Sequence, residues 1–142
     1  MGKVCLITGV GPGTGSALVR RFAEGGYSVA MLARNEERLA ALDAELDNCQ
    51  PFACDVSDAE ALSATYELVE RSLGAPDIIV HNAVAAERGS YMDISPQRLV
   101  KAFEVNTMAL LQLSRLATPH MIESGFGAII CTGNTSAYRG RA

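Results

Sequence analysis

The sequence predicts an α/β protein in which parallel β-strands alternate with α-helices along a single domain, residues 1–142. Two observations carry this prediction. Short apolar segments with β-branched residues alternate with longer segments whose apolar residues recur at helical spacing. A glycine-rich segment, residues 8–15, separates the first apolar segment from the first helical one. Strands connected through helices run parallel with right-handed crossovers, so we expect a doubly wound sheet of five strands.

The first half of the chain holds two strand and helix pairs. Residues 3–8 are apolar and bounded by glycine, which indicates a buried strand. Residues 16–24 carry apolar side chains at helical spacing, and the helix ends at Gly25. Residues 27–33 form the second strand. Residues 36–46 place their leucines on one side and their acids on the other, as an amphipathic helix does.

The middle of the chain repeats the pattern. Residues 50–56 are expected to form the third strand. Ser57 and Glu60 then have the spacing of a capping box, so we expect Ser57 to cap a helix that runs to about residue 73. Residues 77–81 have an almost continuous apolar centre, as expected for a strand covered on both faces.

The last third predicts one long helix and one strand. Ser95 and Pro96 open a helix over residues 97–123, within which Pro119 predicts a kink. Residues 128–132 (AIICT) are expected to form the fifth strand. Nothing after this strand in the 142 residues covers it, so it would be a bare apolar edge.

Composition excludes several classes of protein. The hydrophobic fraction of 49% and the charged fraction of 20% are those of a soluble globular domain. The net charge of −4 argues against nucleic acid or an anionic membrane as a partner. No apolar run approaches the roughly 20 residues that span a bilayer. The four cysteines have no CxxC spacing, so we expect buried thiols, no metal site and a cytoplasmic location.

The glycine-rich segment predicts a dinucleotide site. Gly9, Gly13 and Gly15 have the spacing TGxxxGxG between a strand and a helix. Backbone without side chains can approach a diphosphate, and a helix N-terminus offers free N–H donors and about half a positive charge. We expect Pro12 and Thr14, which lie between these glycines, to contact the same group. A turn with only a conformational role is the alternative interpretation.

The end of the second strand favours NADP over NAD. An NAD site places an acid there, roughly 20 residues after the glycines, to hold the ribose 2′-hydroxyl. This chain has Ala33, Arg34 and Asn35, and its first acid is Glu36. A guanidinium binds a phosphate through paired hydrogen bonds. We therefore expect Arg34 to hold a 2′-phosphate and the adjacent Asn35 to contact the cofactor; a solvated loop arginine is the alternative.

These motifs resemble those of the short-chain dehydrogenase/reductase family. The resemblance covers essentially the whole chain, and it begins with TGxxxGxG on the first turn. Asp55 and Val56, at the end of the third strand, are similar to the family's pair of residues that contact adenine. The resemblance implies a Rossmann-type sheet of order 3-2-1-4-5, apparently truncated here after the fifth strand.

Two further motifs extend the resemblance. His81, Asn82, Ala83 and Val84 look like the family's NNAG element, with His and Val in place of its first Asn and its Gly. The family implies that Asn82 braces the sheet and that Ala83 lines the adenosine site, and we expect Val84 to contact the cofactor. Asn106 matches the asparagine of the family's catalytic tetrad, and we expect it to hold a water in a proton relay.

The rest of the family's catalytic set is incomplete. Its serine follows the fifth strand, where a gapless alignment places Asn134; Ser136 takes that position only if the loop is two residues longer. Its proton donor is a Tyr four residues before a Lys, and none of the four tyrosines here has that partner. We therefore expect the chain to be the amino-terminal part of a longer protein.

The resemblance implies an enzyme that transfers hydride between NADP(H) and a small carbonyl or alcohol, and a homo-oligomer. NAD is the less favoured cofactor. A module that binds NADP(H) without turnover is the alternative, and the missing Tyr–Lys pair favours it. A methyltransferase with a similar glycine turn is disfavoured, because the second strand lacks the acid that would hold a ribose.

Overall fold

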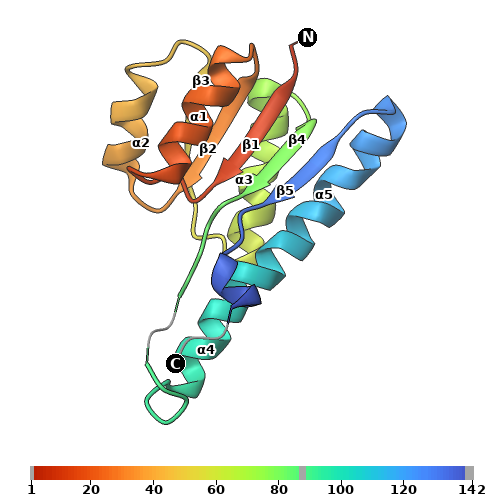
Figure 1. The fold of residues 1–142 in the computed structure, drawn as a ribbon. Coiled ribbons are helices and arrows are strands. Elements are labelled where there is room, and N and C mark those ends of the chain that lie inside the picture. Colours follow the sequence, from red (N-terminus) through yellow and green to blue (C-terminus); the bar gives the residue numbers. More distant parts are fainter. Residues whose placement is uncertain (1, 87–88, 140–142) are drawn as a thin grey trace.

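The strands form one parallel sheet in the order β3-β2-β1-β4-β5, which confirms the predicted topology (Figure 1). The computed structural model describes residues 2–86 and 89–139. The strands lie close to their predicted positions: β1 (Val4–Thr8), β2 (Ser28–Ala33), β3 (Cys49–Ala53), β4 (Ile78–His81) and β5 (Ala128–Cys131). The chain runs outward from β1 to β3 on one side and from β4 to β5 on the other, so the order reverses between β1 and β4. Ligands of such sheets bind outside the strands' carboxyl ends at that point.

The helices cover both faces of the sheet. They are α1 (Thr14–Glu24), α2 (Glu36–Asp43), α3 (Ala59–Leu73), α4 (Pro96–Phe103) and α5 (Ala109–Ser124), with a short 3₁₀ turn, η2 (Thr135–Tyr138), after β5. Buried residues of α1 and α2 form one core cluster and those of α3 and α5 another. Within β1, Leu6 belongs to the α3 side and Ile7 to the α1 side, which is the alternation of a strand buried on both faces.

The predicted helix over residues 97–123 is continuous but not uniform. A π turn, η1 (Glu104–Met108), joins α4 to α5, and the N–H of Ala109 bonds to the carbonyl of Glu104, five residues earlier. Pro119 lies inside α5. In Figure 1 the α4 end of this helix extends past the carboxyl ends of the strands.

The cap of α3 differs from the prediction. Asp58, not Ser57, is the N-cap, because its Oδ1 accepts hydrogen bonds from the N–H groups of Glu60 and Ala61, both at 3.0 Å. Ser57 instead donates its N–H (3.0 Å) and its hydroxyl (2.6 Å) to Oδ1 of Asp55. Its side chain is thereby committed to the end of β3 rather than to the helix.

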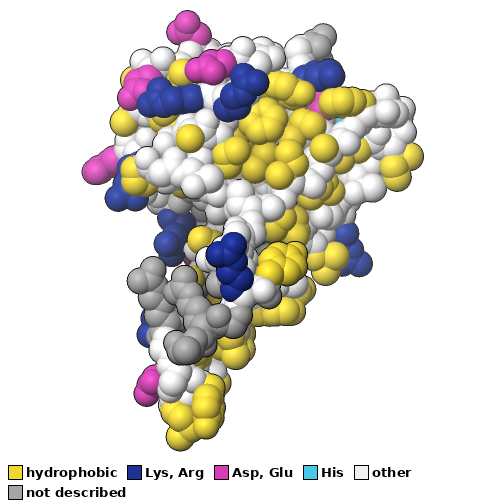
Figure 2. Space-filling view, viewed as in Figure 1, with side chains coloured by type: hydrophobic (Ala, Val, Ile, Leu, Met, Phe, Trp, Pro, Cys, Tyr) yellow, Lys and Arg dark blue, Asp and Glu magenta, His cyan; other side chains and the backbone are white. Residues whose placement is uncertain are grey.

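The outer strand β5 is exposed over all four of its residues. Ile129 and Ile130 are 38% and 43% exposed, and Figure 2 shows hydrophobic side chains gathered over this side of the sheet.

The expectation of buried thiols is confirmed for Cys5 and Cys54, whereas it is wrong for Cys131 at the end of β5. Cys49 is half-buried.

The carboxyl ends of β1 and β4 are joined by a chain of hydrogen bonds. The hydroxyl oxygen of Thr8 accepts the N–H groups of Asn82 and Ala83, both at 3.2 Å. The hydroxyl of Thr8 therefore donates its hydrogen bond to Nδ1 of His81, 3.0 Å away. The other ring nitrogen, Nε2, donates to the carbonyl of Val105 in η1 at 3.0 Å. The buried, neutral His81 thus ties both strands to the π turn.

Two glycines allow the turn after β1 to pack this tightly. Gly9 has a positive φ of 70°, and a Cβ there would lie 2.5 Å from Cα of Ala83. A Cβ on Gly15 would lie 2.4 Å from the carbonyl oxygen of Gly9 and 2.8 Å from Cα of Val10. Gly15 is therefore required for packing of α1 against the turn. At Gly13, by contrast, an added Cβ meets nothing within 4 Å.

We predict that Gly15→Ala lowers the free energy of unfolding by about 1–3 kcal/mol, because its methyl group overpacks the turn. Gly13→Ala is the matched control and loses about 1 kcal/mol or less, the ordinary effect of such a change near a helix start. Urea unfolding followed by circular dichroism measures both. Equal losses in the two variants would contradict the packing argument.

We also predict that His81→Leu lowers the free energy of unfolding by about 2–4 kcal/mol, because the Thr8 hydroxyl and the Val105 carbonyl both lose a buried partner. Urea unfolding at pH 7.5 measures the change. A variant that unfolds at the wild-type urea midpoint would show that these hydrogen bonds contribute nothing to stability.

The same histidine makes wild-type stability depend on pH. Burial lowers the pKa of His81 from its ordinary 6.5, against the smaller opposite effect of the hydrogen bond to Val105. Between that pKa and 6.5 the unfolded chain therefore holds more protons than the folded one. The free energy of unfolding falls as pH drops below 6.5 through this interval. In His81→Leu this part of the pH dependence is absent.

Candidate cofactor site

A cavity of about 580 Å³ opens at the carboxyl ends of the strands, within the size range of small-molecule sites. The glycine turn, the ends of β2 and β3, the loop after β4 and the α4–η1 segment all line it. The structure brings together here seven of the residues that the sequence singled out: Gly9, Arg34, Asn35, Asp55, Val56, Ala83 and Val84.

The amino end of α1 lies next to this cavity and carries three other predicted residues. Pro12, Gly13 and Thr14 are exposed. The helix has no side-chain cap and no acid in its first turn, so the positive end of its dipole is not neutralised. The first N–H groups of a helix have no partner within it. The N–H of Ser16 already donates to the carbonyl of Gly11 at 3.0 Å, so the N–H groups that precede it, with open space in front of Gly13, are the ones that can receive an anion.

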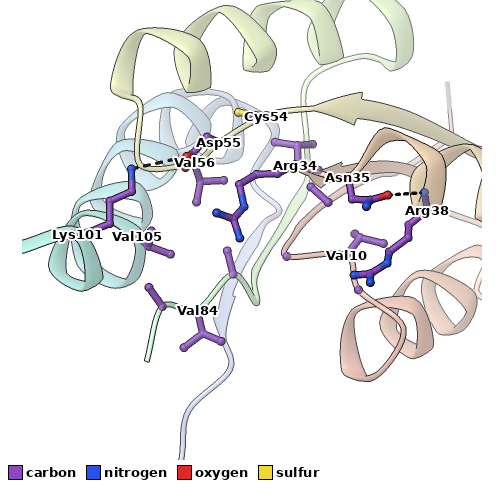
Figure 3. A pocket seen from close by; sticks show the side chains of 16 residues that line it. Val10, Arg34, Asn35, Arg38, Cys54, Asp55, Val56, Val84, Lys101 and Val105 are labelled. Carbon is purple, nitrogen blue, oxygen red and sulfur yellow. Dashed lines mark hydrogen bonds and ion pairs between the residues drawn. The ribbon is translucent and has the colours of Figure 1, made fainter. Parts of the chain in front are cut away.

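Arginines form the β2 side of the cavity. The guanidinium of Arg34 points into it, and Arg38 from α2 also lines it (Figure 3). Asn35 is the N-cap of α2, and its Oδ1 accepts the N–H of Arg38 at 2.9 Å. The cap thus begins the helix whose first turn carries the second arginine. Arg38 was missed by the sequence analysis, although it lies one helical turn after Arg34.

The carboxylate of Asp55 forms the β3 side. Its Oδ1 accepts both hydrogen bonds from Ser57, and its Oδ2 lies 3.6 Å from the ammonium nitrogen of Lys101. The hydroxyl of Ser57 lowers the pKa of this carboxyl below its ordinary 3.8, burial opposes that effect, and the charges of Lys101 and Arg34 add to it. Asp55 is therefore ionised at neutral pH and accepts hydrogen bonds only.

The two asparagines of the family motifs hold backbone segments in place. Asn82 donates from Nδ2 to the carbonyl of Gly9 at 2.9 Å, and its Oδ1 accepts the hydroxyl of Thr132 at 3.1 Å. Asn106 accepts the N–H of Ala85 at 2.9 Å and donates to the carbonyl of Ala85 at 2.8 Å. Neither is among the cavity's lining residues. The predicted water-holding role of Asn106 stays a prediction.

The two candidate serine positions both follow β5. Asn134 is exposed in the segment between β5 and η2. Ser136 falls in η2, and its side chain is outside the described part of the structure. The described residues do not bring Asn134 into the cavity. Which of the two takes the serine position therefore stays open.

Two other kinds of chemistry have no support in the described residues. Residues 2–86 and 89–139 contain no group of three or more His, Cys, Asp or Glu side chains placed to hold a metal ion. Cys54 lines the cavity, but burial raises the pKa of its thiol, so the thiol stays protonated.

Within residues 2–86 and 89–139, no helix combines the length and the apolar character needed to cross a bilayer.

The family model of the short chain dehydrogenases matches residues 3–142. A short chain dehydrogenase of Pseudocercospora fijiensis is 38% identical over 143 aligned residues, which cover 96% of this chain and 46% of that protein. The chain spans about half the length of the curated relatives it matches.

Solved structures give the same result. A 3-ketoacyl-(acyl-carrier-protein) reductase from Brucella melitensis, crystallised with NADH, matches with a TM-score of 0.90 and 29% identity, over 98% of this chain and 60% of that one. A metagenomic short-chain oxidoreductase in complex with NADP matches with a TM-score of 0.85 and 30% identity, over 91% and 61%. Because the family match runs from β1 to the last residue, the chain belongs to the short-chain dehydrogenase family.

Proposed function

We propose that this chain forms the NADP(H)-binding half of an oxidoreductase that acts on a small carbonyl or alcohol compound. The observation that carries the proposal is the cavity at the carboxyl ends of the strands, whose sides are the glycine turn, two arginines and an ionised Asp55. Similar structures hold NADH or NADP. The nicotinamide group, when bound, supplies the hydride chemistry.

Each side of the cavity suits one part of a dinucleotide. The amino end of α1, with open space at Gly13, would receive the diphosphate. Asp55 and Val56 would hold the adenine, the carboxylate accepting a hydrogen bond from the amino group of the base. Ala83 and Val84 would pack against the adenosine. These residues bind and orient the cofactor.

The arginines support NADP rather than NAD. Arg34 and Arg38 line the cavity on the β2 side, and none of the described lining residues on that side has a carboxylate to hold a ribose 2′-hydroxyl. Glu36, the first acid after β2, is exposed in the first turn of α2 and does not line the cavity. Two guanidinium groups beside one ribose suit a 2′-phosphate, which accepts paired hydrogen bonds from each.

The chain contributes less to the substrate side. We assign Asn134 or Ser136 to the substrate oxygen, since both follow β5 as the family's serine does. Asn106 fixes the loop after β4 through Ala85 and so shapes the neighbouring wall of the cavity. The proton donor is assigned to sequence outside residues 1–142, because no tyrosine here is followed by a lysine four residues later.

A protein that binds NADP(H) without turnover is the second candidate function. The specific observation in its favour is the same lack of a Tyr–Lys pair in residues 1–142, together with an amide, Asn134, in place of a hydroxyl. The two functions make the same prediction for cofactor binding. They differ in one assay: only the enzyme oxidises NADPH when the full-length protein is supplied with ketones or aldehydes.

We predict that Arg34→Ala and Arg38→Ala each weaken NADPH binding by about 10- to 100-fold, because charge-assisted hydrogen bonds to the 2′-phosphate are lost. NADH binding changes by less than about twofold, since NADH has no such phosphate. Fluorescence titration gives both dissociation constants. The control is Arg71→Ala, which removes an exposed arginine of α3 and changes neither dissociation constant. An unchanged NADPH-to-NADH ratio in both cavity variants would refute the NADP assignment.

Gly13→Ala tests the diphosphate seat separately. We predict at least a tenfold loss of affinity, because the added methyl group occupies the space in front of α1. The loss is equal for NADPH and NADH, since both carry the same diphosphate, so their ratio stays at the wild-type value. Isothermal titration calorimetry measures it, with the unfolding curve as the control. Wild-type affinity in this variant would place the diphosphate elsewhere.

A further inference from the structure

A lysine closes the adenosine side of the cavity from a distant part of the chain. Lys101 lies in α4, and its ammonium group reaches the end of β3, where it donates to the hydroxyl of Ser57 and forms an ion pair with Asp55 at 3.6 Å. Figure 3 shows the side chain extended from α4 toward Asp55. Lys101 and Asp55 both line the cavity.

Among residues 2–86 and 89–139, the contacts leave one oxygen of Asp55 available to a ligand. Oδ1 already accepts two hydrogen bonds from Ser57, at 3.0 and 2.6 Å. The ammonium nitrogen of Lys101 stands 3.6 Å from Oδ2, which is longer than a hydrogen bond. Oδ2 is thus fixed in direction by a neighbouring positive charge while it keeps lone pairs for another N–H donor.

The stability of the fold does not explain this pair. The side chains of Lys101 and Asp55 are 51% and 41% exposed, and ion pairs at that exposure contribute little to the free energy of unfolding. Two half-exposed side chains that converge at a cavity rim are better explained by what enters the cavity. A purine with an exocyclic amino group offers the N–H donor that an ionised carboxylate lacks.

We propose that Lys101 is a positioning residue that holds the Asp55 carboxylate in the direction required to bind the amino group of adenine. This inference rests on the proposed NADP(H) site and names a residue, from α4, that strengthens its binding of adenine. Lys101 acts through Asp55 and Ser57 rather than through its own contact with the cofactor. The pair also links α4, which extends past the sheet, to the strand end that holds the base.

The test is a double-mutant cycle in the full chain. Dissociation constants for NADPH and for adenosine 2′,5′-bisphosphate are measured with wild type, Lys101→Met, Asp55→Asn and the double variant. We expect Lys101→Met to weaken both ligands by the same factor, about three- to fivefold. In the Asp55→Asn background the same substitution has no further effect, because the charge that it positions is gone. Lys101→Arg restores most of the affinity.

The controls separate this inference from the proposed function. Lys3→Met removes the chain's other lysine, far from the cavity, and leaves both dissociation constants unchanged. Wild-type affinity in Lys101→Met, or an equal loss in the Asp55→Asn background, would overturn the positioning role and leave the NADP(H) site in place. A wild-type chain that binds neither ligand would overturn both proposals. A loss with NADPH but not with the bisphosphate would place the effect away from adenine.

Discussion

One hydroxyl group organises the edge of this sheet at which the cavity opens. The hydroxyl oxygen of Thr8 accepts hydrogen bonds from two consecutive N–H groups of the loop after β4, and the hydroxyl donates a hydrogen bond to a buried imidazole. That imidazole, on His81, reaches the π turn of the long helix. Because Gly9 has no side chain, the loop can approach the turn after β1 closely enough for these bonds to form. Three of the segments that line the cavity are held together at this point.

The sequence was sufficient for the topology and for the glycine turn. Both depend on local patterns. Alternating strand and helix periods predict a parallel sheet, and glycines between a strand and a helix predict a turn whose backbone is not covered by side chains. Arg34 was predictable for the same reason, since it follows directly on β2. The structure refines the roles within the turn. Gly15 is needed for packing against Gly9, whereas Gly13 faces open space.

Other parts of the site depend on distances that no local pattern contains. Lys101 and Asp55 are far apart in the sequence and meet only because α4 extends past the strand ends. The π turn arises inside a helix whose sequence shows regular helical spacing. At the start of α3, both Ser57 and Asp58 are residue types that cap helices well. Asp58 is the cap because the hydroxyl of Ser57 donates its hydrogen bond to Asp55 instead. Asn106 was identified by its motif, but its bonds to Ala85 were not.

The pairing of β1 with β4 also determines when the site can form as the chain is made. β1, β2 and β3 lie within the first part of the sequence, so the arginine side of the cavity assembles from a continuous segment. Thr8 and His81, in contrast, are 73 residues apart, and closing a loop of that length costs entropy before any contact forms. On a ribosome, synthesis proceeds from the amino terminus, so Thr8 has no hydrogen-bond partner for its side chain until β4 and the loop after it have emerged. The turn after β1 therefore acquires its hydrogen-bond partners only once β4 has been synthesised, and the α4–η1 side of the cavity follows later still.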